Sequence, residues 1–266
     1  MHSYDTTSDG PSSQPEFERP DDGPRIWLTW AILAANVLIY IAMAITIGNF
    51  FSFPPKDLIA WGGNFAPSIA DGEVWRVLTA VFLHAGIIHL GMNMWVLTTI
   101  GPFMERLFGV TSFALIYLLA GLAGNVFGLL FHADVVGVGA SGAIFGLYGA
   151  LMGFLFIRRH VIPAEVLQPL MQNGLYFLGI NLVLGFSVPG VDVAAHVLGA
   201  VAGLVGGIAA TWPQAENPRT AWLLRNALLA VLCLAVAGAL PFCIPASAKV
   251  QARFLAAMQN LGDQRE

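Results

Sequence analysis

The sequence predicts an all-α polytopic membrane protein with about seven transmembrane helices and an interfacial first loop. Three observations support this fold class: the composition, a series of long apolar segments, and polar side chains placed at similar depth in three of them. Of the 266 residues, 57% are hydrophobic and 11% are charged, and the mean hydropathy is +0.72. Soluble domains carry about 25% charged residues, so the composition is that of a membrane protein.

A membrane-spanning helix needs about 20 mostly apolar residues. Seven segments are long and apolar enough to be such helices, at residues 26–47, 88–104, 111–131, 139–157, 170–186, 193–211 and 221–242. Residues 1–24 are rich in Ser, Pro, Asp and Glu and are predicted to be a disordered polar tail. We therefore expect a six-helix core at residues 25–212, followed at residues 213–266 by an additional transmembrane helix and a short tail.

The first connection, residues 49–87, is too long for a turn and too mixed in polarity for a span. Aromatic rings prefer the membrane–water interface. The segment combines Pro, Gly and charged residues with aromatic residues, so it is predicted to be an ordered loop lying in the interface; the aromatic residues are Phe50, Phe51, Phe53, Trp61, Phe65 and Trp75.

Lys and Arg predict the orientation. With the N-terminus inside, seven of these residues lie on the cytoplasmic side and five on the outer side, and the pair Arg158–Arg159 lies in a short inner loop. Cytoplasmic loops carry an excess of such charges. We expect an integral, multi-pass protein, in the plasma (inner) membrane of a bacterium, with a cytoplasmic N-terminus.

Three of the predicted spans begin with polar side chains. Ser141 opens one within the run GASGAIFG, His196 opens another, and His89 and Asn93 open a third. These three helices run in the same direction, so at 1.5 Å rise per residue the side chains lie about 5–10 Å below one surface. Polar groups at that depth are costly, which indicates one shared site.

Glycines recur in two of these spans, at spacings of three or four residues. Such stripes let helix backbones approach closely in lipid, although they also serve as general packing devices in many membrane proteins. Close packing of the two helices would bring the Ser141 hydroxyl within reach of the His196 ring. The glycines are Gly142, Gly146, Gly149 and Gly153 in one helix, and Gly199, Gly203 and Gly207 in the other.

These side chains supply the parts of a hydrolytic site. A serine hydroxyl needs a base to remove its proton, and histidine suits that task near neutral pH. Ser141 and His196 form such a pair, and His89, Asn93 and the Ser141 backbone N–H could stabilise an oxyanion. Asp192 lies one turn before His196, where it suits a helix N-cap better than the third member of a triad. A Ser–His dyad is the simpler interpretation.

Other sites are not supported by the sequence. Residues 137–142 match G-x-G-x-x-G without the flanking strand of a dinucleotide site, and Ala143 breaks the G-x-S-x-G pattern. No H-E-x-x-H is present and no basic stripe follows the chain. We therefore expect no cofactor, no metal and no nucleic-acid partner. Cys233 and Cys243 are predicted to be packing residues.

An ordered set of motifs resembles the rhomboid family of intramembrane serine proteases and covers roughly residues 50–210. The matching pieces are Trp75-Arg76, His84, HLGMN at residues 89–93, Glu105-Arg106, GASG at residues 139–142 and AHVLGAVAG at residues 195–203.

The resemblance implies a rhomboid-like six-helix core, here with a seventh helix after it. It implies Ser141 as nucleophile, His196 as general base, and His89 and Asn93 as oxyanion stabilisers. Phe145 stands where some members have a Tyr that stacks on the catalytic His.

His84 and Gly139 are taken as supporting residues; for His84 a plain structural role stays open. The expected function is hydrolysis of peptide bonds in or near transmembrane segments of membrane proteins, within membrane lipid.

Two further function classes stay open. A catalytically silent rhomboid-like factor would bind membrane proteins without cutting them, and it would usually have lost the nucleophile or the base. Ser141 and His196 are both present. A transporter or channel is less well supported, because the spans lack a second set of buried charges along a path.

Overall fold

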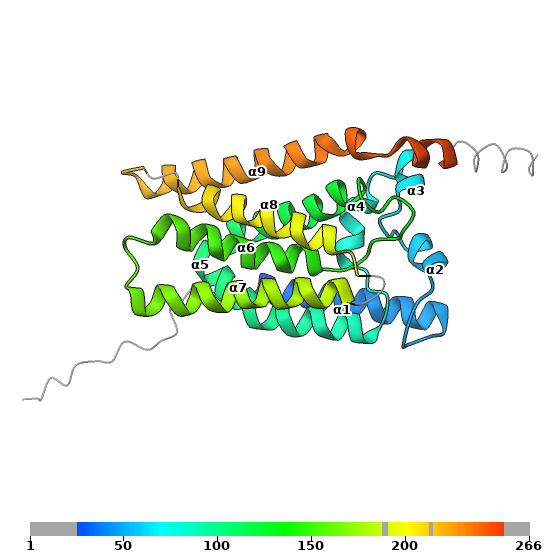
Figure 1. Cartoon of the computed structure of the whole chain (residues 1–266), viewed down its shortest axis with the longest axis horizontal. Helices are drawn as coiled ribbons and strands as arrows, with labels where there is room; N and C mark the ends of the chain where they lie inside the picture. Colours follow the sequence, from blue (N-terminus) through cyan, green and yellow to red (C-terminus); the bar gives the residue numbers. More distant parts are fainter. Residues whose placement is uncertain (1–25, 188–190, 213–214, 253–266) are drawn as a thin grey trace, which may run out of the picture.

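The computed structural model describes residues 26–187, 191–212 and 215–252, and the regular structure in these residues is helical apart from two isolated backbone bridges (Figure 1). The predicted tail at residues 1–24 lies outside the described residues. The long helices are α1 (Leu28–Ile47), α5 (Ile87–Gly128), α6 (Ser141–Arg158), α7 (Ala164–Ser187), α8 (Val193–Thr211) and α9 (Pro218–Cys243). The short ones are α2 (Pro55–Ala60), α3 (Ala66–Ala70), α4 (Arg76–Thr79) and η2 (Ala80–Phe82).

Helix α5 crosses the bundle twice. Its 42 residues contain Gly109, whose φ of 77° lies in the left-handed region that breaks a helix. Glu105, before the break, contacts the start of α1, whereas Gly128, at the end of α5, lies beside Asp192 near the start of α8. The two halves of α5 therefore correspond to the second and third predicted spans, and each of the seven predicted segments is helical in the described chain.

Five helices of the described chain are long and apolar enough to cross a membrane: α1, α5, α6, α8 and α9. Helix α7 begins six residues earlier than the predicted start at residue 170. Gln172, Asn173 and Asn181 lower the hydropathy of even its most apolar stretch, so α7 is less apolar than the other five helices.

Glycines set the distance between α6 and α8, as the stripes predict. A Cβ atom on Gly199 would overlap the carbonyl oxygen of Gly142, and one on Gly203 would overlap that of Gly146. A Cβ on Gly207 would likewise meet the carbonyl oxygen of Ala150. Backbone touches backbone along the whole contact, which is possible only without side chains. This contact brings the starts of α6 and α8 together.

The first loop is folded, as predicted. It contains α2, α3, α4 and η2, and the buried Arg76 holds it together. The Arg76 guanidinium donates to the backbone carbonyls of Ile59 and Gly63 and to the carboxylate of Glu73. Phe50, Phe51 and Trp75 are exposed in the structure; their position in a membrane interface stays a prediction.

The seventh helix, α9, packs on α5 and α8. In the first third of α9, the Ser112 hydroxyl donates to the side-chain oxygen of Asn226, 3.0 Å away in the buried interface with α5. At its other end, Leu240 and Cys243 pack in one cluster with Ile69 of the first loop. Both Cys233 and Cys243 are buried and free, which confirms the predicted packing role.

Candidate active site

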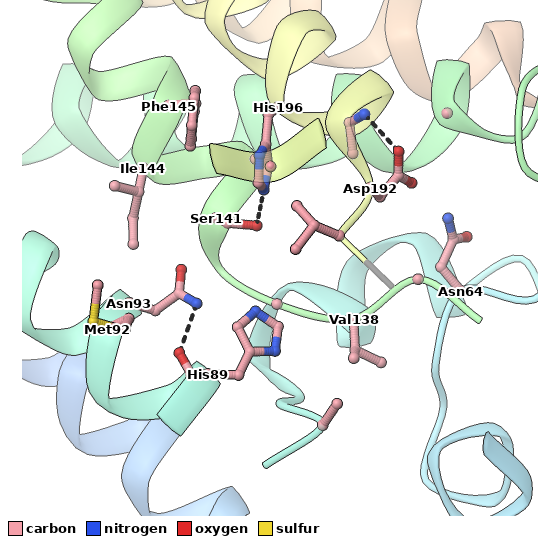
Figure 2. Close-up of a pocket in the computed structure, with 18 of the residues that line it drawn as sticks. Asn64, His89, Met92, Asn93, Val138, Ser141, Ile144, Phe145, Asp192 and His196 are labelled. Carbon is pink, nitrogen blue, oxygen red and sulfur yellow. Dashed lines mark hydrogen bonds between the residues drawn. The ribbon is translucent and has the colours of Figure 1, made fainter. Parts of the chain in front are cut away.

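The closest contact at the candidate site joins Ser141 and His196. Ser141 is the first residue of α6 and His196 lies in the first turn of α8. The His196 Nε2 lies 2.8 Å from the Ser141 Oγ (Figure 2). With the imidazole proton on Nδ1, the Nε2 accepts the hydroxyl proton, which is the arrangement that a general base requires. The predicted proximity of the two side chains is thus confirmed.

Phe145 fixes the plane of the His196 ring. The two rings stack with centroids 4.3 Å apart and an interplanar angle of 12°. Phe145 lies one turn after Ser141 on α6, so one helix carries both the hydroxyl and the surface against which the histidine rests. On its other side Phe145 contacts Phe177 of α7, at a centroid distance of 5.6 Å.

The backbone before Ser141 is held in a conformation that suits glycine. Gly139 has a φ of 129° and its N–H donates to the carbonyl of Ala80 over 2.9 Å. A Cβ at this position would lie 2.9 Å from the Cε1 and Nε2 atoms of His89. The His89 ring therefore lies directly against the turn that leads into Ser141, at a distance that no larger residue at position 139 would allow.

His89 and Asn93 both face the cavity from the first turns of α5 (Figure 2). The Asn93 Nδ2 donates one hydrogen bond to the His89 carbonyl at 2.9 Å. An amide nitrogen carries two hydrogens, so one of them remains for another acceptor. In the described residues neither side chain is hydrogen-bonded to Ser141, and the open space between them and Ser141 belongs to the cavity.

His84 supports His89 from behind. Its ring is fully buried and meets the His89 ring edge-on, with centroids 5.0 Å apart and an angle of 66°. Burial, and next the proximity of His89, lower the pKa of His84 from 6.5 to about 3. The ring is therefore neutral near pH 7. The backbone of Phe82 lies near the ring and partly offsets this lowering of the pKa, but neither ring nitrogen makes a hydrogen bond of normal geometry within the described part of the chain.

Asp192 caps helix α8, as predicted. Its Oδ1 accepts a hydrogen bond of 2.9 Å from the backbone N–H of Ala195, which is one of the unpaired donors at a helix start. The same oxygen lies 3.2 Å from the Nδ1 of His132. No motif or spacing in the sequence connects His132 with Asp192.

These residues surround a cavity of about 890 Å³, within the usual range for ligand sites. One part of its wall is apolar and includes Ile88, Met92, Val96 and Ile144. Sequence reasoning missed several further lining residues, among them Asn64 and Asn125. Asn125 lies within an apolar span, so the signal that singled out Asn93 could also have singled out Asn125. Asn64, in the polar first loop, gave no such signal.

Within the described ranges, no three His, Cys, Asp or Glu side chains gather closely enough to hold a metal ion.

Comparison with known proteins agrees with this architecture. The family model for the Rhomboid domain matches residues 71–213. Rhomboid protease GluP of Bacillus subtilis is 35% identical over 187 residues, which cover 70% of this chain and 35% of that protein. RHOMBOID-like protein 6, mitochondrial, of Arabidopsis thaliana is 33% identical over 225 residues, which cover 74% of this chain and 71% of the relative.

A third relative, putative rhomboid protease YdcA of Bacillus subtilis, is 30% identical over 181 residues, covering 66% of this chain and 89% of its own length. The chain thus spans about a third of GluP and most of the other two relatives. It belongs to the rhomboid family. Together with the apolar helices, family membership makes it an integral membrane protein.

Proposed function

We propose that the protein is an intramembrane serine endopeptidase that hydrolyses peptide bonds in or near transmembrane segments of other proteins. The observation that carries this proposal is the 2.8 Å contact between the Ser141 hydroxyl and the His196 Nε2 beside a cavity. Two of its relatives are named rhomboid protease or putative rhomboid protease.

In the proposed reaction, the Ser141 Oγ attacks the carbonyl carbon of the scissile peptide while His196 Nε2 takes the hydroxyl proton. The carbonyl oxygen becomes an oxyanion that accepts hydrogen bonds from His89, Asn93 and the Ser141 backbone N–H. His196 then gives its proton to the leaving amine, and the C–N bond breaks to form an acyl-enzyme. Water, deprotonated by His196, attacks the ester and releases the second product with Ser141 restored.

The proposed substrate is a transmembrane segment that can unwind locally. A transmembrane helix keeps its carbonyl groups hydrogen-bonded, so the scissile bond must leave the helix before Ser141 can reach it. We expect a small residue such as Ala at the cut, as the family resemblance implies, and Gly or Pro nearby. With the N-terminus cytoplasmic, the cut would lie near the outer surface of a bacterial inner membrane.

Labelling with a fluorophosphonate tests the function directly, because such a probe reacts only with an activated serine. The full chain in detergent and its Ser141→Ala variant should be compared, with cleavage of a transmembrane reporter measured beside the labelling. Labelling and cleavage that both disappear in Ser141→Ala are the expected result. A wild-type protein that binds the reporter but is neither labelled nor cleaves it would instead be a silent rhomboid-like binding factor.

A further inference from the structure

The segment that leads into Ser141 is joined to the first loop by backbone hydrogen bonds. The N–H of Asn64 donates to the carbonyl of Gly137, and the N–H of Gly137 donates to the carbonyl of Asn64, both over 2.9 Å. Next to this pair, a Cβ on Gly63 would overlap the side chain of Val136. The first loop and the approach to Ser141 therefore lie in direct contact along one extended edge (Figure 2).

Two asparagine side chains extend this connection to the helices. The Nδ2 of Asn64 donates to the carbonyl of Asn125 in α5, and the Nδ2 of Asn125 donates to the carbonyl of Val77 in α4, each over 2.9 Å. Helix α4 leads into Ala80, whose carbonyl accepts from the N–H of Gly139. The hydrogen bonds thus form a closed path from Gly137 through α5 and the first loop back to Gly139, two residues before Ser141.

Two links of this path are made by side chains, each of which donates to a backbone carbonyl. Asn64 is only 6% exposed, and in a low-dielectric interior a buried amide that loses its partner is costly. The Asn64 side chain connects residues 62–64 to the backbone of α5. The Asn125 side chain connects the same turn of α5 to the backbone of α4. The side chains of Arg76 and Thr79 in α4 still donate to the carbonyls of Gly63 and Gly62. Removing either amide therefore keeps the backbone pair at Gly137 and these bonds to α4, but breaks the connection through α5.

We propose that Asn64 and Asn125 are positioning residues of the active site: they hold the 137–141 segment, through the first loop, at the height where Ser141 meets His196. This inference rests on the proposed function, since it concerns the reactivity of Ser141. Each Nδ2 donates to a backbone carbonyl, and among the described residues no hydrogen bond joins either side chain to Ser141 or His196, so both act through the backbone that they hold.

The test uses Asn64→Ala and Asn125→Ala in the full chain, with Asn226→Ala as the matched control. Asn226 is also a buried asparagine, 8% exposed, with two side-chain hydrogen bonds, to Ser112 and to Trp222. It lies in the first third of α9, a helix that begins at the end of the bundle opposite to the start of α8 (Figure 1). Each variant is measured for unfolding temperature, for the rate of fluorophosphonate labelling per folded molecule, and for kcat and KM on a transmembrane reporter.

Misplacement of a reacting group by about 1 Å can cost about 100-fold in rate. We expect Asn64→Ala and Asn125→Ala each to lower kcat and the labelling rate about 10- to 100-fold, with KM unchanged. The kcat and labelling rate of the double variant should be about those of the less active single variant, because both amides belong to one path. Asn226→Ala should lower the unfolding temperature but keep the labelling rate of the folded protein.

Other outcomes would overturn the inference. Equal labelling rates for all three variants would make Asn64 and Asn125 ordinary structural residues, and a raised KM with unchanged labelling would make them substrate-binding residues. If Asn64→Ala does not fold, Asn125→Ala, which removes a bond from a partly buried side chain, carries the same test. A wild-type protein that is neither labelled nor active would contradict the proposed function itself. An active wild type whose Asn64→Ala and Asn125→Ala variants are equally active would contradict only the positioning role.

Discussion

Two buried polar clusters lie at opposite ends of the bundle, and they differ in how completely their hydrogen-bonding groups are paired. At the end remote from Ser141, the carboxylate of Glu105 is 1% exposed. Its two oxygens accept from the backbone N–H groups of Trp27, Leu28 and Thr29 at 2.8–3.0 Å and from the Thr29 hydroxyl at 2.7 Å. These are the unpaired donors at the start of α1, so Glu105 caps that helix from α5.

The cluster around Ser141 is less fully paired. Beyond the contact with Ser141, the His196 Nδ1 has no partner among the described residues, and neither does any nitrogen of the His84 ring. Asn93 uses its amide within its own helix, with a hydrogen to spare. Buried polar groups that only support a fold are normally satisfied. The comparison therefore teaches that the Glu105 cluster is structural, whereas the Ser141 cluster keeps capacity for a ligand.

The largest effect should follow from breaking the Ser141 cluster itself. Ser141→Ala and His196→Ala should each lower kcat by roughly four orders of magnitude or more, because each removes half of one nucleophilic pair. The double variant should be about as slow as either single variant. Reporter cleavage with purified protein measures this. A double variant much slower than both single variants would show that the two side chains act independently.

A smaller loss of kcat is expected when the proposed oxyanion donors Asn93 and His89 are replaced one at a time. Asn93→Ala should raise the activation free energy by about 2.7–4 kcal/mol, which is two to three orders of magnitude in kcat, with little change in KM. His89→Ala should cost more, because the His89 ring also packs against Gly139. Steady-state kinetics decide the point: a raised KM with unchanged kcat in Asn93→Ala would make Asn93 a substrate-binding residue.

At the opposite end, a substitution should affect stability and leave the chemistry intact. Glu105→Gln turns an amide NH₂ toward backbone N–H donors and should lower the free energy of unfolding by about 1–3 kcal/mol. The rate of fluorophosphonate labelling per folded molecule should not change. Denaturation in detergent and labelling on the same samples measure both. A slower labelling rate in the folded variant would mean that the two clusters are coupled.

The smallest effect on stability at neutral pH is expected at His84. Its ring nitrogens make no hydrogen bond of normal geometry, so an apolar side chain in its place removes none. Because the pKa of His84 is lowered from 6.5 to about 3, the unfolded state binds its proton first on acidification. The free energy of unfolding therefore has its full value above pH 6.5 and falls as the pH decreases toward 3. His84→Leu should remove up to about 1.4 kcal/mol per pH unit of this dependence.

Unfolding measured at pH 7 and pH 5 tests this expectation. Equal stability of the two proteins at pH 7, with the variant more stable than wild type at pH 5, is the expected pattern. The same loss between the two pH values in both proteins would show that His84 is not buried in its neutral form.

Local features of the sequence were enough to predict the site's main pair. Hydropathy located the helices, and the glycine spacings of α6 and α8 predicted the backbone contact that brings Ser141 to His196. The position of Asp192 four residues before His196 predicted the cap that the structure contains. Each of these inferences depends on residues within a few turns of one helix, where geometry follows from the helical repeat.

Other contacts were decided by the tertiary structure alone. Glu105 and Thr29 are 76 residues apart, and Asn64 and Asn125 are 61 residues apart; no periodicity connects either pair. His132 reaches Asp192 only because α5 returns to the site end after its break at Gly109. Composition and spacing determine which segments become helices and which faces can touch. Hydrogen bonds from a side chain to a distant backbone depend on the height at which the helices pack, and that height is set by the whole bundle.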